Sequence, residues 1–205
     1  MKQLLLVRHG EADGIAPGAL LGRTDPSLSE RGRRQCAHLR ALVPSGAGTA
    51  WLCSPLARAR QTAAIVTWGR DLSLEIDPDL SEIDFGEWEG LSYEEIKSRY
   101  PERAEQWSRF AADFAFPGGE SLFDFQARIE RVGDRLTSAD RETLVVFTHG
   151  GVIRALICHF LGLDLRDYLL FDVGPAAVAT LHLWDGRGVL AGLTRTPGDR
   201  GQAEA

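Results

Sequence analysis

The stretch that decides the fold is LLLVRHGE at residues 4–11, and LVVFTHGG at residues 144–151 repeats its pattern. Each is a run of aliphatic residues that ends abruptly in a His-Gly pair, which is typical of a fully buried strand in a parallel sheet. In open α/β sheets, ligands bind beyond the carboxyl ends of such strands. We therefore predict that His9 and His149 face one another across a single crevice at one edge of a sheet.

Short apolar segments and amphipathic helices alternate along the rest of the chain, which predicts an α/β sandwich of three layers. We expect a mainly parallel central sheet with helices on both faces. Further strands are expected at residues 50–53, 74–77 and 143–148, with a terminal hairpin of residues 178–184 and 189–193. Helices are expected at residues 29–43, 54–68, 92–100 and 152–161, directly after Pro101, and from a cap at Ser121 and Asp124 through Leu136.

No repeat or linker interrupts this pattern, so we expect a single domain over residues 1–197. A small helical insertion is expected at about residues 84–120, and residues 198–205 are expected to form a disordered tail. The 205 residues are enough to bury a substantial core.

Composition narrows the classes of partner. The net charge of −6 argues against nucleic acid, because phosphate backbones favour a basic surface. No apolar stretch approaches the roughly 20 residues that span a bilayer, and the N-terminus lacks the apolar region of a signal peptide. We therefore expect a cytoplasmic protein without a membrane partner, and both a monomer and a homodimer remain open. The cysteines lack metal-type spacing and are expected to be structural: Cys36, Cys53 and Cys158.

Charged side chains follow the ends of the predicted strands. In chain order they are Arg8, His9, Arg58, Glu82 and His149. Because these ends lie at one edge of a parallel sheet, two guanidinium groups, two imidazoles and one carboxyl group converge there, which forms a site for a dianion. Side chains supply the positive charge, so we expect no metal and no cofactor, and a small phosphorylated metabolite as the partner.

Glycines and a helix end are expected to add backbone groups to this site. Gly10, Gly150 and Gly151 would let backbone N–H groups approach closely, and the helix that begins near Gly151 would direct its positive end into the pocket.

The residue types also indicate a reaction. An imidazole nitrogen is a competent nucleophile toward phosphorus, and a phosphohistidine splits one difficult step into two. The carboxylic acid of Glu82 would protonate the departing alkoxide and then activate water. Arg8, Arg58 and the second histidine would stabilise charge on the transferring oxygens. The spacing alone leaves open which histidine attacks.

Five blocks, in order between residues 4 and about 163, resemble the histidine phosphatase superfamily, also called the phosphoglycerate mutase-like family. They are LVRHGE (6–11), GRTD with LSERG (22–25 and 28–32), SPLARARQT (54–62), LSE with FGEWEG (80–82 and 85–90), and THGGVIR (148–154). The resemblance implies that His9 is the nucleophile and Glu82 the proton donor. It also implies that Arg8, Arg58 and His149 bind the phosphoryl group. We expect the substrate to be bound by Arg8, Arg58, Gly10, Gly22 and Gly150.

The chain departs from the family pattern at three positions. The family usually has Asn where this chain has Ile15, Ser or Thr where it has Leu21, and Thr where it has Ala12. These changes remove neutral hydrogen-bond donors and keep every charge. Because charged hydrogen bonds are roughly twice as strong as neutral ones, we expect activity to survive with weaker phosphate affinity or a changed choice of substrate.

Within the family, a phosphatase is favoured over a mutase. Mutases have a longer insertion between the acid and the second histidine and usually follow that His-Gly with Asn, whereas here 67 positions separate Glu82 from His149 and Gly151 follows. A non-catalytic phosphate-binding regulator is the other alternative. Residues 85–90 and 116–121 are similar to α-ribazole phosphatases of cobalamin biosynthesis, to broad-specificity sugar phosphatases and to bisphosphatase domains. We favour α-ribazole-5′-phosphate as the substrate.

Other residues of chemical interest are expected to be structural. His38, His159 and His182 fall outside the blocks, and Arg60 points to a different helix face from Arg58. For Phe85 and Trp88, both a place in the substrate pocket and packing of the insertion are left open. Glu120 is near enough along the chain to reach the site, and Ser121 is explained by its role as a helix cap.

Overall fold

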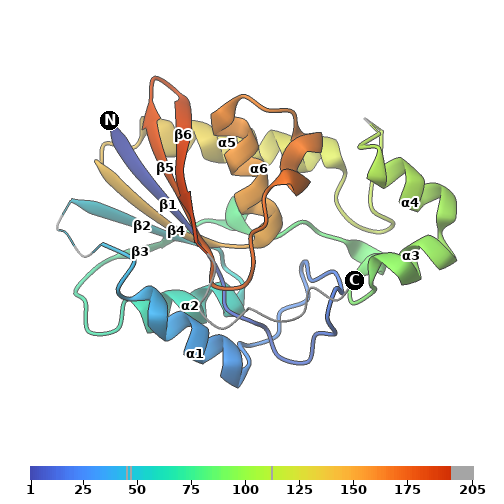
Figure 1. The fold of residues 1–205 in the computed structure, drawn as a ribbon, viewed down its shortest axis with the longest axis horizontal. Coiled ribbons are helices and arrows are strands. Elements are labelled where there is room, and N and C mark those ends of the chain that lie inside the picture. The colour runs from blue at the N-terminus through green and yellow to red at the C-terminus, as the bar shows by residue number, and fades with distance from the viewer. Residues whose placement is uncertain (45, 47, 112, 195–205) are drawn as a thin grey trace.

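A six-stranded sheet forms the centre of the computed structural model, which describes residues 1–44, 46, 48–111 and 113–194 (Figure 1). The strands are β1 (Lys2–Arg8), β2 (Thr49–Cys53), β3 (Leu74–Ile76), β4 (Thr143–Thr148), β5 (Val178–Trp184) and β6 (Arg187–Leu193). Their order in the sheet is β3-β2-β4-β1-β5-β6. The first four strands in this order are parallel to one another, and β5 pairs antiparallel with both β1 and β6. The expected mainly parallel sheet is confirmed. The expected tail at residues 198–205 lies outside the described residues.

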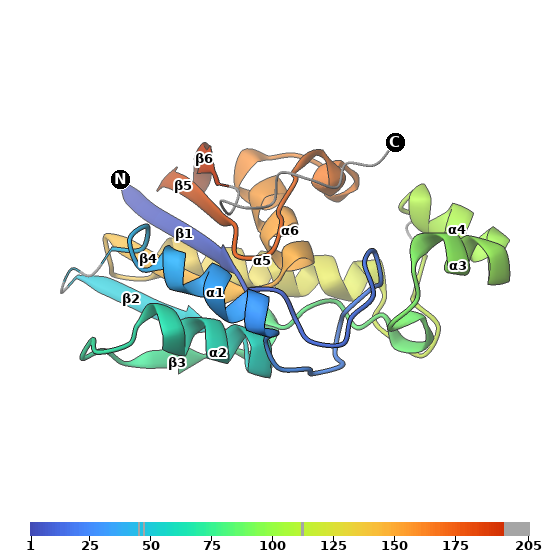
Figure 2. The same ribbon diagram turned by 60° about the horizontal axis from the view of Figure 1, so that its bottom comes forward.

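Helices cover both faces of this sheet, as expected. They are α1 (Glu30–Leu39), α2 (Ala57–Val66), α3 (Tyr93–Arg99), α4 (Pro101–Ser108), α5 (Leu122–Ser138) and α6 (Gly150–Leu161). The alternation of side chains along β1 explains the layers: Leu4 and Leu6 lie in the core shared with α5 and α6, whereas Leu5 and Val7 lie in the core shared with α1 and α2. Figure 1 shows the sheet between these two pairs of helices, and in Figure 2 α1 and α2 lie in front of it.

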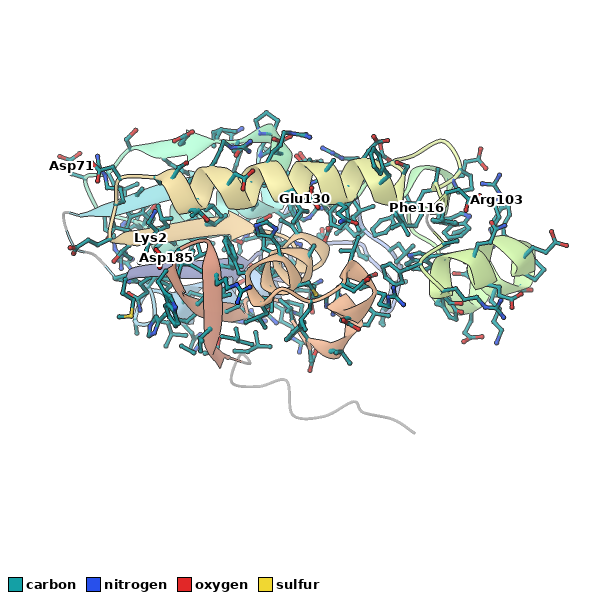
Figure 3. All side chains as sticks on the ribbon, turned by 90° about the horizontal axis from the view of Figure 1, so that it is seen from above. Lys2, Asp71, Arg103, Phe116, Glu130 and Asp185 are labelled. Carbon is teal, nitrogen blue, oxygen red and sulfur yellow. The ribbon has the colours of Figure 1, made fainter. Side chains whose placement is uncertain are left out.

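The insertion stands away from the sheet and has its own aromatic core. It contains a short 3₁₀ helix (Gly86–Trp88) and helices α3 and α4, which project to one side in Figures 1 and 2. Figure 3 shows Phe116 between the body and the outlying helix that carries Arg103. Trp88 has no exposed surface. The centroid of its ring lies 5.6–5.9 Å from the centroids of four other aromatic rings: Tyr100, Trp107, Phe114 and Phe116. Of the two roles left open for Trp88, packing of the insertion is therefore the one observed.

Two helix boundaries differ from the expectation. Helix α1 ends at Leu39 rather than Val43, and the chain continues in turns in which Leu42 and Val43 donate to the Leu39 carbonyl. Pro44 disfavours the helical conformation at the residue before it, so the last predicted turn does not form. The prediction that Ser54 caps α2 is wrong, because the N-cap is Leu56 and the Ser54 hydroxyl bonds to His149 instead.

Two further boundaries shift by two residues. Helix α6 starts at Gly150, with His149 as its N-cap, instead of at residue 152. Strand β6 starts at Arg187 because the hairpin turn uses only Asp185 and Gly186, whose φ angles of 51° and 75° suit a tight two-residue turn. No helix in the described part of the chain is long and apolar enough to cross a membrane.

The aromatic core of the insertion makes a testable prediction about stability. Truncating a fully buried Trp costs about 3–5 kcal/mol, since the apolar contacts are lost and a cavity remains. Trp88→Ala is therefore expected to lower the free energy of unfolding by that amount, measured by urea denaturation. Trp68→Ala, at a tryptophan that is 75% exposed, is the matched control and should change it by less than about 0.5 kcal/mol. Equal losses in the two variants would contradict the assignment of Trp88 to a core.

Candidate active site

His9 lies directly after β1 and presents one ring nitrogen to the site. Its Nδ1 is 2.6 Å from the carbonyl oxygen of Gly10, so Nδ1 carries the proton and donates it to that carbonyl. Its Nε2 then holds a lone pair, and the Arg58 Nε–H donates toward this nitrogen at 3.3 Å. The arrangement leaves Nε2 as the ring nitrogen of His9 that keeps a lone pair.

Both histidines are neutral near pH 7. Burial lowers the pKa of His9 well below its usual 6.5, and the charges of Arg8 and Arg58 lower it further. Burial also lowers the pKa of His149 well below its usual value, with His9, Arg58 and Arg8 adding to the effect. A neutral His9 keeps the Nε2 lone pair that a nucleophile needs.

Arg58 is fully buried and fixes the loop that faces His9. It lies in the first turn of α2 and donates to the carbonyls of Thr24 (2.8 Å) and Gly22 (2.7 Å) as well as to His9. Burial lowers its pKa, and the carboxylates of Glu82 and Asp25 oppose this shift. The guanidinium therefore remains a cation at neutral pH.

Arg8 supplies the second cation at the end of β1. Its guanidinium donates to the Val173 carbonyl at 2.5 Å, while its Nε is buried without a partner among the described residues. Burial lowers the pKa of Arg8 to about 10, so it is still charged at neutral pH. A Cβ atom at Gly150 would lie 3.2 Å from this guanidinium, which explains the absence of a side chain there.

His149 lies across from His9 at the start of α6. The two ring centroids are 5.1 Å apart, and His149 has no exposed surface. Its Nε2 lies 2.7 Å from the Ser54 hydroxyl, and its Nδ1 is buried without a partner in the part of the chain that the structure describes. Nε of Arg8 and Nδ1 of His149 are thus two buried nitrogen atoms without a partner among the described residues.

Glu82 follows β3 and is held by backbone N–H groups. Its two carboxyl oxygens accept from Ile83 N at 3.0 Å and from Gly151 N at 2.9 Å. A Cβ atom at Gly151 would lie 2.5 Å from the Glu82 carboxyl oxygen, so a larger residue there would displace the carboxyl group. The first turn of α6 therefore positions both the acid and the second histidine.

An ion pair between Arg128 and Glu120 supports the backbone at Glu82, and the sequence patterns did not predict it. Arg128 donates to the carbonyls of Asp79 (2.7 Å) and Glu82 (3.1 Å), and it forms two hydrogen bonds with the Glu120 carboxylate at 2.7 and 2.9 Å. The sequence did contain a signal for a buried arginine, because Arg128 lies on the same helix face as the buried Phe125 and Val132. An arginine on an apolar face requires a buried acceptor.

Gly10 and Gly22, two of the glycines predicted to bind substrate, already have hydrogen-bond partners in this structure. Gly10 N donates to the Thr62 hydroxyl at 3.2 Å. Gly22 N donates to the Glu89 carboxylate at 3.0 Å, and the Gly22 carbonyl accepts from Arg58 at 2.7 Å. The roles of Gly10, Gly22 and Gly150 toward a substrate stay predictions.

The remaining candidate residues are not brought into this cluster. His38 is exposed and contacts the Arg34 carbonyl, while His159 packs against Phe160. Arg60 is exposed, and the three positions that depart from the family pattern are half-buried: Ala12, Ile15 and Leu21. Among the described residues, no group of three His, Cys, Asp or Glu side chains is arranged to hold a metal ion.

Comparison with known proteins gives consistent matches over nearly the whole chain. The model of the histidine phosphatase superfamily (branch 1) matches residues 4–196. Phosphoserine phosphatase 1 of Hydrogenobacter thermophilus is 32% identical over 197 residues, which cover 96% of this chain and 93% of that protein. The adenosylcobalamin/alpha-ribazole phosphatase of Salmonella typhimurium is 32% identical over 188 residues, covering 90% and 92%. The crystal structure of the alpha-ribazole phosphatase from Shigella flexneri matches with a TM-score of 0.81 at 28% identity, covering 92% and 94%.

The two buried histidines predict how stability depends on pH. Their pKa values are lower in the folded state than in the unfolded state. As the pH falls through about 6.5, the unfolded chain takes up protons that the folded chain does not, so stability is lost. Between about pH 7.5 and 5.5, we expect the free energy of unfolding to fall by about 1 kcal/mol for each histidine.

Urea denaturation at the two pH values measures this loss. The double substitution His9→Gln with His149→Gln should remove most of the loss, whereas His38→Gln, at an exposed histidine, should retain it. A loss of the same size in the double variant would show that other groups cause the pH dependence.

Proposed function

The chain belongs to the histidine phosphatase superfamily and is a phosphatase, and we propose that it hydrolyses small phosphomonoesters through a phosphohistidine on His9, without a metal ion. The observation that carries this proposal is the neutral His9 ring, whose Nδ1–H is held by the Gly10 carbonyl. Its Nε2 lone pair lies beside the fully buried Arg58, and the half-buried Arg8 is the second cation suited to a phosphoryl group.

In the first step, the Nε2 lone pair of His9 attacks phosphorus as the bond to the ester oxygen breaks. The carboxyl group of Glu82 gives its proton to the leaving oxygen, which departs as an alcohol. Arg8 and Arg58 bind the phosphoryl oxygens and stabilise the charge that develops on them. Neither cation has to be recruited during the reaction, since both are already held by backbone carbonyls.

In the second step, water attacks phosphorus and the bond to Nε2 breaks. The Glu82 carboxylate, now without its proton, accepts one from the attacking water. The products are inorganic phosphate and His9 with its lone pair restored. The N-terminus of α6, which begins at Gly150, directs its positive end toward the same group throughout.

We propose α-ribazole-5′-phosphate as the substrate, with phosphoserine as the alternative. Relatives that carry these two names are equally similar in sequence. An aromatic pair supports the first: the ring centroids of Phe110 and Tyr168 are 5.1 Å apart, and burial raises the pKa of Tyr168, with the charge of Glu82 adding to the rise. Aromatic rings stack well on a flat heterocycle such as the base of α-ribazole.

We also propose that the chain acts in the cytoplasm. Its three cysteines are free and buried, which suits a reducing compartment: Cys36, Cys53 and Cys158. The net charge of −6 disfavours nucleic acid and supports a free metabolite as the partner.

A phosphohistidine trap tests the mechanism. After brief incubation with a ³²P-labelled phosphomonoester and rapid quenching, we expect label on the protein that is labile to acid and stable to base. His9→Ala should carry no label, because the attacking nitrogen is gone. His38→Ala, which removes an exposed histidine outside the site, is the matched control and should be labelled like the wild type.

Absence of label on the wild type, or label on His9→Ala, would overturn the covalent mechanism. The labelling should also proceed in excess EDTA. A loss of turnover under that condition would overturn the metal-free part of the proposal.

A substrate panel tests the proposed specificity. It contains α-ribazole-5′-phosphate, phosphoserine, 3-phosphoglycerate and fructose bisphosphates, and kcat/KM is measured from released phosphate. We expect kcat/KM for α-ribazole-5′-phosphate to exceed kcat/KM for phosphoserine by about tenfold or more, which is the discrimination that a few well-placed contacts provide. The reverse order would assign the chain to phosphoserine.

A further inference from the structure

Ser54 contacts the second histidine from the end of a neighbouring strand. It directly follows β2, has no exposed surface, and its hydroxyl lies 2.7 Å from Nε2 of His149. The backbone N–H of Leu56 also donates to this hydroxyl, at 3.3 Å. These are the two hydrogen-bond partners that the Ser54 hydroxyl has among the described residues.

Counting hydrogens decides the direction of the bond between Ser54 and His149. A serine hydroxyl has one hydrogen to donate, and the Leu56 N–H is itself a donor, so it cannot receive that hydrogen. Nε2 of His149 is the available acceptor. If Nε2 carried a proton instead, the Ser54 hydrogen would be buried without a partner, which is costly.

Nδ1 of His149 must then carry the proton of the neutral ring. This nitrogen is buried and unpartnered, as is Nε of Arg8. Both atoms are then hydrogen-bond donors without acceptors, and a phosphoryl group offers acceptors only. With the opposite tautomer, a lone pair on Nδ1 would face the oxygens of a dianion and repel them.

We propose that Ser54 is a positioning residue that holds neutral His149 as its Nδ1–H tautomer, so that His149 donates a hydrogen bond to the phosphoryl group. The inference rests on the proposed function for the identity of the ligand. A neutral imidazole donates from one nitrogen alone, so its tautomer decides whether it binds or repels the substrate. Burial, together with four cationic or imidazole neighbours, keeps the pKa of His149 low enough for this choice to matter.

The tautomer can be measured directly in the free enzyme. Long-range ¹H–¹⁵N correlation spectra separate protonated from unprotonated ring nitrogens, and with five histidines in the chain, His149→Gln identifies the His149 signals. The wild type should show His149 with Nε2 unprotonated. In Ser54→Ala, the ring should redistribute toward the Nε2–H tautomer, because the donor that holds Nε2 as an acceptor is absent.

Cys53→Ala is the matched control. Cys53 is the last residue of β2 and is fully buried, and its thiol donates to the backbone carbonyl of Ser54 rather than to the hydroxyl that contacts His149. The His149 tautomer should not change in this variant. A protonated Nε2 in the wild type, or an unchanged tautomer in Ser54→Ala, would overturn the proposal. Because no substrate is present, this result is independent of whether His9 is later found to be phosphorylated.

Kinetics with p-nitrophenyl phosphate test the consequence for catalysis. Ser54→Ala should lower kcat by roughly tenfold to hundredfold, the order lost when an oriented donor in an active site is removed or turned away. Cys53→Ala should lower kcat by less than about twofold.

A double-mutant cycle separates action through His149 from a merely structural effect. In a His149→Ala background, Ser54→Ala should cost less than about twofold, since the group on which it acts is gone. An equal loss in both backgrounds would overturn the proposal, because Ser54 would then act by another route.

Discussion

Burial of the Arg58 guanidinium is the constraint on which the rest of the site depends. A cation without exposed surface must find acceptors inside the protein, because an unpaired buried charge costs several kcal/mol. Arg58 finds them in the carbonyls of Thr24 and Gly22 and in Nε2 of His9. One side chain therefore joins the first turn of α2, the loop at residues 22–24 and the end of β1. The same loop is held from the insertion by Glu89, whose carboxylate accepts from the N–H groups of Gly22, Arg23 and Thr24.

A second arginine holds the acid from the opposite face of the sheet. Arg128 on α5 binds the carbonyls of Asp79 and Glu82 and is itself paired with Glu120, at the end of the insertion. Helices on the two faces thus each contribute an arginine that fixes a loop of the site, and the insertion contributes a carboxylate to each loop. Donors and acceptors that are fixed before substrate arrives need no reorganisation in the transition state.

Much of the fold was predictable because its signals are local. Uninterrupted aliphatic runs identified the two central strands, and the Ser92–Glu95 capping box and the Ser121 cap identified two helix starts. The exceptions arise where a tertiary contact competes with a local preference. Ser54 followed by proline is a good helix start, yet its hydroxyl bonds to His149 and the helix begins later. The sequence places Arg128 on an apolar helix face. Its hydrogen-bond partners could not be predicted, because they lie 8 to 49 positions away and no local pattern identifies them.

The sequence by itself determined which residues stand at the strand ends, since a parallel sheet places those ends at one edge whatever the connections between them. It therefore predicted a cluster of two arginines, two histidines and one glutamate. The tertiary structure alone decided the state of each group: which nitrogen of His9 keeps its lone pair, which nitrogen of His149 contacts Ser54, and what holds Glu82 in place. The physical reason is that these states depend on hydrogen bonds between atoms that only folding brings together. Arg58 and His9 are 49 positions apart, and Ser54 and His149 are 95 apart.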